Sequence, residues 1–491
     1  MGDSLTDTLD RYTPDILSVV LKSVLYSALA IAFVSLDQWG LLFLPILFVL
    51  LAFTKRAGME LLVISILILM ENCFDFIVPA QLPTLIISRG FRLNALDLLI
   101  IPAATVCCFK LMSQKNKPAS IWFVNGYLLL STVYLAVGFF NTGGLASGGA
   151  IYFRTLLYAG FYYIAMVHFA RKENIAMIFF VLGFIVVFAT VLQIIEFFQG
   201  SRFVLSWIEE TKGVYGEEGQ RLLSGGEQRL YLWSRVTGMA YLTVPFFLGY
   251  YLLAKNRKLP SLTIALMSIL TFVLASVRSW MVIISVAMLI VLFNSRINRR
   301  VIYSIFGFIG LFFLALFPIQ YAAVSTGNTD LLASLTGRIA SIFNPQSTAG
   351  ETDTFTVRLF ASGVLFLKFL ESPIFGHGIG AVILDTYYNS DLGMLNRMVM
   401  FGLLGTLPLL YYLIRYAVKL RKRIKVEVNL FHRIVLITSL AVIVSHLPAY
   451  AFQYDFWGNG WIVFILLVMA ASDRIMMETE TPMVQNAAPA R

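Results

Sequence analysis

The sequence predicts an all-α membrane protein that crosses the bilayer about fourteen times. Hydrophobic residues make up 59% of the 491-residue chain and charged residues only 13%, which is more apolar than soluble domains usually are. Uncharged apolar runs of about 17–22 residues recur along the chain, and each is long enough to cross a hydrocarbon core of ~30 Å as a helix. In that core each backbone N–H and C=O must find a partner within its own segment, which favours helices.

The predicted spans divide the chain into one polytopic domain, residues 1–475, and a polar tail rich in Pro and Ala, residues 476–491, which is expected to be disordered. No cleavable signal peptide is expected, because the polar N-terminal stretch is not followed by a short apolar region with a small-residue cleavage site. The spans are expected at roughly residues 17–35, 39–54, 60–78, 95–112, 120–140, 152–170, 175–198, 236–254, 260–277, 279–294, 300–321, 394–414, 431–449 and 459–475.

Short connections rich in Lys and Arg indicate which side of the membrane is cytoplasmic. With these spans, the most basic connections all fall on one side, so that side and both termini are predicted to be cytoplasmic. A single missed span would have broken this alternation, and the agreement therefore supports the topology. The basic connections are residues 54–56, 114–117, 171–174, 255–258, 294–300 and 415–425.

Two long connections, residues 200–235 and 322–393, are predicted to be extracytoplasmic loops, and several arginines lie in them or beside them. Guanidinium groups form paired hydrogen bonds with phosphate oxygens, so arginines that converge at a membrane surface suit a lipid-linked diphosphate. Ordinary solvated charge is the alternative for the loop residues. It is weaker for Arg278, which lies between two apolar runs, where an unpaired charge is costly. The arginines are Arg221, Arg229, Arg235, Arg278, Arg338 and Arg358.

The stretch LSGGEQR, residues 223–229, resembles the signature of ABC-transporter ATPases. Such an ATPase also needs a phosphate-binding loop, G-x-x-x-x-G-K-[ST], and this chain contains no Gly-Lys pair. The predicted topology also places the stretch on the side that lacks ATP. We therefore interpret its two glycines as a turn and exclude an ATPase.

Several motifs resemble the O-antigen polymerase and ligase superfamily of bacterial inner-membrane glycosyltransferases. RVTGMAYLTVPF (235–246) resembles its R-x-x-G segment without the usual Pro-Asn, and ASVRSW (275–280) resembles its Thr/Ser-x-Ser-Arg turn with Val277 in place of the second Ser. VRLFASGVLFLKFLESPIFGHGIG (357–380) resembles a helix that runs to a Pro-x-x-Gly-x-Gly loop. SDLGMLNRMVMFGLLG (390–405) resembles the segment that ends in Gly-x-x-Gly, and RLNALDLLI (92–100) resembles an early span opened by Asp.

This resemblance implies an enzyme that uses an undecaprenyl-diphosphate-linked glycan on the outer face of the membrane. Ligases of the superfamily pass the glycan to lipid A core, and polymerases pass it to another lipid-linked repeat unit. The ligase pattern has a His-Asn pair where this chain has Asp391-Leu392, which favours a polymerase of O-antigen, capsule or exopolysaccharide. A ligase, or a flippase of lipid-linked oligosaccharides, is the alternative, although a flippase should consist of two similar halves.

The resemblance also implies roles for the arginines. Arg235 and Arg278 are the strongest candidates for contacts with the diphosphate. Arg358 opens an amphipathic segment that faces either lipid head groups or the site. Arg221 and Arg229 bind the anionic lipid or glycan in this interpretation, or are simply solvated, and Arg338 is the weakest candidate.

The proposed reaction needs a group that accepts a proton from the acceptor hydroxyl. Asp391 and His377 are the candidates, with a helix cap or a held arginine as the alternative for Asp391 and a local turn hydrogen bond for His377. No metal and no cofactor are expected, because arginines can neutralise the leaving diphosphate and the outer loops lack a ligand cluster. The expected partners are lipid-linked oligosaccharides and membrane lipid, with a chain-length regulator and a flippase as candidates, and no nucleic acid.

Overall fold

A computed structural model of the whole chain describes residues 12–35, 57–69, 84–88, 91–114, 116–142, 157–199, 234–254, 258–274, 278–295, 354–387, 392–452 and 462–485. Nearly all of these residues are helical, so the predicted helical class is confirmed for the described part of the chain. The exception is an antiparallel hairpin of β1 (Thr84–Ser88) and β2 (Phe91–Asn94), which was not predicted. The predicted spans 39–54 and 300–321 lie outside the described residues.

Every other predicted span overlaps a helix of the structure. The helices are α2 (Ile16–Ser35), α4 (Ala57–Leu69), α5 (Ala95–Met112), α6 (Ile121–Thr142), α8 (Ala159–His168), α9 (Lys172–Gln199), α12 (Ser234–Leu253), α13 (Lys258–Leu274), α14 (Arg278–Asn294), α17 (Thr354–Glu371), α18 (Ala381–Tyr387), α19 (Gly393–Val426), α20 (Leu430–Phe452) and α21 (Ile462–Gln485). Within the described chain, α6, α9, α19 and α20 contain stretches long and apolar enough to cross a membrane, and shorter apolar stretches lie in α2, α4, α5, α12, α13 and α14. These features support a membrane protein.

Two boundaries differ from the prediction. Helix α19 continues to Val426, so the basic connection predicted from residue 415 is helical, since Leu, Arg, Lys and Ile sustain a helix there without Gly or Pro. Helix α21 continues to Gln485, so the prediction of a disordered tail is wrong for residues 476–485. There Lys172 holds the helix through an ion pair with Glu478 (2.8 Å).

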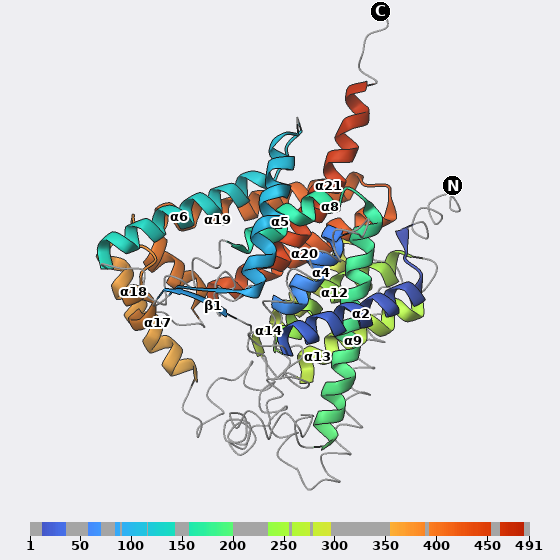
Figure 1. The fold of residues 1–491 in the computed structure, drawn as a ribbon, viewed down its shortest axis with the longest axis horizontal. Coiled ribbons are helices and arrows are strands. Elements are labelled where there is room, and N and C mark those ends of the chain that lie inside the picture. Colours follow the sequence, from blue (N-terminus) through green and yellow to red (C-terminus); the bar gives the residue numbers. More distant parts are fainter. Residues whose placement is uncertain are drawn as a thin grey trace, which may run out of the picture.

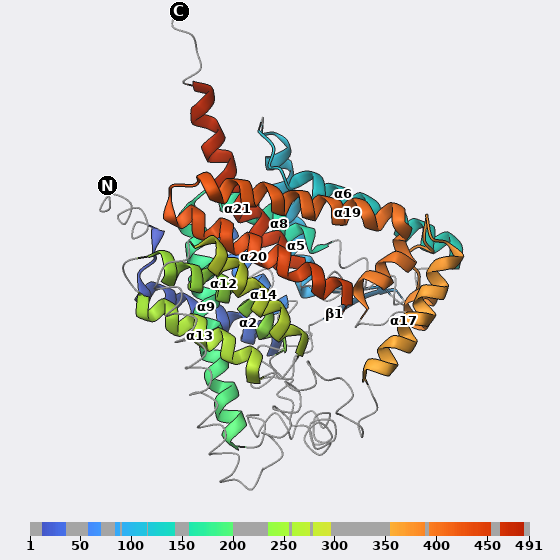
Figure 2. The same ribbon diagram turned by 180° about the vertical axis from the view of Figure 1, so that it is seen from behind.

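Most helices form one bundle, and a smaller group stands apart from it. Figures 1 and 2 show α17 and α18 at one edge of the molecule, joined to the bundle by the long helices α6 and α19. The bundle and the smaller group have separate apolar cores, the second formed mainly by α17, α19 and the C-terminal half of α6. Hydroxyl groups also link neighbouring helices of the bundle, as between Thr243 of α12 and Ser268 of α13 (2.9 Å).

The helix ends next to the predicted cytoplasmic connections lie on one face of the bundle. Contacts between them join segments far apart in the sequence, and α9 runs from this face to the opposite end of the molecule (Figure 1). The contacts are Thr13 Oγ1 with Tyr250 Oη (2.7 Å), Ser120 N with Asp473 Oδ2 (2.7 Å), Lys172 Nζ with Glu478 Oε2 (2.8 Å), Arg433 Nη2 with Asn294 O (3.0 Å), and Arg474 Nε with Met166 O. The described helix ends that border these connections therefore lie together, in agreement with the charge pattern.

The connection between α19 and α20 on this face is fixed by polar contacts. Glu427 forms an ion pair with Arg423 (3.0 Å) and accepts a hydrogen bond from the Asn429 N–H (3.2 Å). Asn429 in turn caps the start of α20 by accepting the His432 N–H (3.2 Å). Burial disfavours the Glu427 carboxylate, but the neighbouring His432 ring (Nδ1 to Oε1, 3.7 Å), the hydrogen bond from the Asn429 N–H and the charge of Arg423 outweigh it and lower the pKa of Glu427. The carboxylate is thus ionised at neutral pH.

Candidate functional site

A glycine-rich loop, residues 372–380, follows α17 and meets a break in α19. Gly376 (φ 69°) and Gly378 (φ 83°) have positive φ angles that side chains disfavour. Gly402 (φ 59°, ψ −171°) interrupts the helical path of α19. The predicted helix with a Pro-x-x-Gly-x-Gly loop is therefore present, and it meets the predicted Gly-x-x-Gly segment.

The break in α19 releases backbone groups that the loop then binds. Without the break these groups would pair within the helix, so the kink and the loop depend on each other. On its other side the loop also pairs with α6. The bonds run from His377 N to Val399 O (2.9 Å), Gly378 N to Met400 O (2.9 Å), Leu403 N to Pro373 O (2.8 Å), Leu404 N to Ile374 O (3.1 Å) and Ile379 N to Tyr134 O (2.8 Å).

Four glycines allow these backbones to touch. A Cβ atom on Gly138 of α6 would overlap the Ile379 carbonyl, and one on Gly378 would overlap the backbone of Gly138. A Cβ on Gly376 would meet the backbone of α19 at residues 400–402, and one on Gly402 would overlap the backbone of the loop at residue 374. We call Gly138, Gly376, Gly378 and Gly402 the glycine junction. It packs α6, the loop and α19 against one another at backbone distance.

His377 lies within the junction and holds the end of α17. Its Nε2 atom is 2.9 Å from the Lys368 carbonyl oxygen, so Nε2 carries the proton and donates it. The backbone carbonyl of His377 accepts a hydrogen bond from the Asn141 side chain (3.1 Å). The bond between His377 Nε2 and the Lys368 carbonyl is the local hydrogen bond expected as the alternative to proton transfer.

Charged and aromatic side chains flank the loop. Lys368 forms an ion pair with Glu371 (2.5 Å), and its ammonium lies 5.1 Å from the centre of the Tyr387 ring in α18. The hydrogen bond from Lys368 lowers the pKa of the exposed Glu371 carboxyl. Lys368 thus ties the end of α17 to α18 across the loop.

Arg397 is a candidate that the sequence reasoning missed. It lies in α19 between the position of Asp391 and the kink at Gly402, and only 1% of it is exposed. Its guanidinium carbon is 5.1 Å from the centre of the Phe401 ring. The available signal was an arginine inside a predicted apolar span, a position where charged residues are usually functional.

The structure describes only some of the other predicted residues. Arg235 and Arg278 stand in the first turns of α12 and α14, two helices that pack on each other and on α20. Arg358 stands in the first half of α17. The remaining candidates, Asp391, Arg221, Arg229 and Arg338, lie outside the described residues.

The helix starts at Arg235 and Arg278 point in the same direction along the bundle. Short connections make α12, α13 and α14 successive antiparallel neighbours, so α12 and α14 are parallel and begin at the same end. That end is opposite the face where the basic connections meet, because α12 ends near Tyr250 and α14 ends at Asn294, which both contact that face. Helix N-termini attract anions, which adds to the charge of the two arginines.

No group of three or more His, Cys, Asp or Glu side chains that could hold a metal ion is present among the described residues. Comparison of the sequence with known proteins found no matching protein-family model and no matching curated protein. The function proposed below therefore rests on the resemblance of the motifs and on the geometry of the glycine junction and of the helix starts at Arg235 and Arg278.

Proposed function

We propose that this protein is a polysaccharide polymerase of the bacterial inner membrane, which transfers glycans between undecaprenyl-diphosphate-linked repeat units. The observation that carries the proposal is the glycine junction. Two motifs that resemble the O-antigen polymerase and ligase superfamily, Pro-x-x-Gly-x-Gly and Gly-x-x-Gly, bind each other there through their backbones. Two segments that did not act together in the structure would not need to align their backbone groups in this way.

The proposed topology has about fourteen spans, two extracytoplasmic loops, residues 200–235 and 322–393, and both termini in the cytoplasm. The gathering of the basic connections on one face of the bundle supports it. The junction, together with the starts of α12 and α14, then belongs to the outer side, where a lipid-linked glycan would be accessible.

In the proposed reaction, a base removes a proton from a hydroxyl of the acceptor sugar as that oxygen bonds to the anomeric carbon of the donor. The bond between the anomeric carbon and the diphosphate breaks, and the diphosphate leaves with the bonding electron pair. Arg235 and Arg278 neutralise the leaving group, as a metal would in other transferases. We add Arg397 to the proposed site as a buried cation near the junction.

The proposal is tested by adding a purified lipid-linked repeat unit to the protein in nanodiscs. A ladder of longer glycans supports a polymerase. Transfer to lipid A core without a ladder indicates a ligase. Unchanged donor that moves across vesicle membranes indicates a flippase and overturns the enzyme proposal.

Replacement of Arg278 by Ala is expected to lower the rate of chain extension by about 10²–10³-fold, the usual effect of removing one group that stabilises developing negative charge. Arg278→Lys should recover only part of the rate, because ammonium cannot form paired bonds with phosphate. The control is Arg171→Ala, which removes an exposed arginine at a predicted cytoplasmic connection. Wild-type chain lengths in Arg278→Ala would remove Arg278 from the site.

The identity of the base is tested by Asp391→Asn and His377→Gln. The hydrogen bond to the Lys368 carbonyl gives His377 a structural role, and we take Asp391 as the expected base. Asp391→Asn should then reduce the rate by about 10²–10⁴-fold. His377→Gln keeps a donor for the carbonyl and should retain the rate within about tenfold, with an unchanged pH profile. The reverse result would assign the proton transfer to His377.

A further inference from the structure

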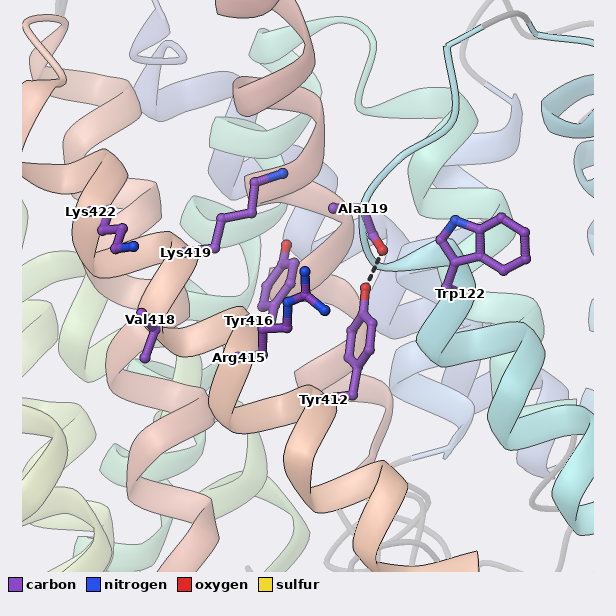
Figure 3. Close-up of a pocket in the computed structure, with 8 residues that line it drawn as sticks. All are labelled: Ala119, Trp122, Tyr412, Arg415, Tyr416, Val418, Lys419 and Lys422. Atoms are coloured by element: carbon purple, nitrogen blue, oxygen red, sulfur yellow. Dashed lines mark hydrogen bonds between the residues drawn. The ribbon is translucent and has the colours of Figure 1, made fainter.

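A basic pocket lies between the start of α6 and the C-terminal half of α19, at the other ends of the two helices that meet in the glycine junction. It is a cavity of about 610 Å³ (Figure 3). Its lining includes Trp122, Tyr412 and Tyr416 and the cations Arg415, Lys419 and Lys422. The mechanism proposed above uses none of these residues.

The three cations of the pocket share one side of α19. Arg415, Lys419 and Lys422 are spaced at i, i+4 and i+7, which brings them onto one helix face. All three side chains are exposed, and none forms an ion pair or hydrogen bond with another residue in the described part of the chain. Figure 3 shows the Arg415 guanidinium beside the Tyr416 and Tyr412 rings, with Lys419 above them.

The inner wall of the pocket is built from aromatic rings whose hydroxyls are already bonded. Tyr416 donates to the buried carboxylate of Asp473 (2.7 Å), and Tyr412 donates to the Ala119 carbonyl. The rings of Tyr412 and Tyr416 lie nearly parallel, with centres 6.4 Å apart. Asp473 also accepts the Ser120 N–H (2.7 Å), and Lys419 interacts with this carboxylate electrostatically, while the side chains of the three cations stay exposed to a ligand.

The position of the pocket along α19 corresponds to the level of lipid head groups. Beyond the kink at Gly402, α19 continues over residues 403–426, about 36 Å at 1.5 Å per residue, which exceeds a hydrocarbon core of ~30 Å. Its apolar stretch ends at Ile414, and the cations begin with Arg415. Trp122, which is 69% exposed, lies at the mouth of the pocket, as tryptophans do at membrane interfaces.

We propose that this pocket binds the phosphate-bearing head group of an anionic phospholipid from the cytoplasmic leaflet. The cations contact the phosphate, the tyrosine rings cover the glycerol, and the acyl chains lie along the exposed apolar side of α19, which includes Val418 and Ile414. The site is independent of the glycosyltransferase proposal, because its residues lie away from the junction.

The test uses full-length protein in detergent with phosphatidylglycerol, and native mass spectrometry counts the bound lipid. The variant Lys419→Gln with Lys422→Gln is expected to bind about thirtyfold more weakly than wild type, from the usual contribution of basic residues near anionic lipid. The control is Arg421→Gln with Lys425→Gln, which removes the same charge from exposed positions of α19 outside the pocket. The control should bind within about threefold of wild type.

Three results would overturn the proposal. Equal losses in the two double variants would indicate general attraction of the helix to anions. Equal binding of phosphatidylcholine would remove the role of net negative charge. Displacement by inorganic phosphate or glycerol phosphate at concentrations similar to the lipid would assign the pocket to a soluble ligand.

A second measurement locates the lipid. Brominated phosphatidylglycerol quenches the fluorescence of nearby tryptophans, so the quenched fraction should fall when Trp122 is replaced by Phe. With brominated phosphatidylcholine, the same replacement should change the quenched fraction little. Circular dichroism and size-exclusion profiles of all variants check that they are folded. Quenching that is unchanged in Trp122→Phe would place the lipid elsewhere and contradict the proposal.

Discussion

Replacement of Gly378 by Ala is expected to destabilise the glycine junction by about 3 kcal/mol or more and to abolish any activity that depends on it. The added Cβ would sit in a backbone conformation with φ 83° and would overlap the backbone of Gly138. Neither backbone can yield without breaking the bonds that join the loop to α6 and α19. The loss is measured by thermal unfolding in detergent and by faster hydrogen exchange of the loop amides.

The matched control for this change is Gly363→Ala in α17. Gly363 has a helical backbone with no atom within 4 Å of an added Cβ, so alanine should stabilise the helix by about 0.5–1 kcal/mol. Both variants add one methyl group to one helix–loop segment. If Gly378→Ala were as stable as Gly363→Ala, the backbone contact between the loop and α6 would not exist.

Replacement of Asp473 by Ala is expected to cost about 2–3 kcal/mol, the second largest effect among these variants. Asp473 is 1% exposed and joins three segments, because it accepts bonds from the Ser120 N–H and hydroxyl and from the Tyr416 hydroxyl. Without the carboxylate, the Ser120 N–H loses its acceptor in a buried position. Unfolding in detergent, followed by circular dichroism, measures the cost.

Glu478→Ala is the control for Asp473, since it removes a carboxylate about one and a half turns further along α21. Glu478 is half exposed, and the buried Lys172 ammonium that it pairs with also donates to the Arg474 carbonyl (3.3 Å), so the loss of Glu478 should cost about 1 kcal/mol, less than the loss of Asp473. Asp473→Asn should lie between the two, because the amide keeps one acceptor oxygen. Equal costs for Asp473→Ala and Glu478→Ala would show that the buried contacts contribute nothing.

The helices were predictable because lipid leaves a long apolar run few other ways to satisfy its backbone. The extension of α19 beyond residue 414 was not, since a cluster of charges ends an apolar run without ending a helix. That error concealed the basic pocket: the spacing of Arg415, Lys419 and Lys422 matters only if the segment is helical. From the sequence alone, these charges predicted only the side of the membrane on which the segment lies.

The candidate site was predictable in part. Resemblance singled out the loop around His377 and the segment that ends at Gly402 and Gly405. It did not reveal that the two segments bind each other, since backbone pairing between segments distant in sequence leaves no local pattern. Gly138 was missed for the same reason, because its task is set by the Ile379 carbonyl of another segment. Arg397 was missed although an arginine in an apolar span is a visible signal.

In the glycine junction, the position of the loop and the surface that the loop exposes depend on different groups. Its path depends on main-chain bonds to α6 and α19, while the side chains of Ile374 and Phe375 remain exposed and take no part in those bonds. Changes at these two positions can therefore alter the surface offered to a ligand without moving the loop. The four glycines thus fix the position of the loop, while its exposed side chains are free to differ.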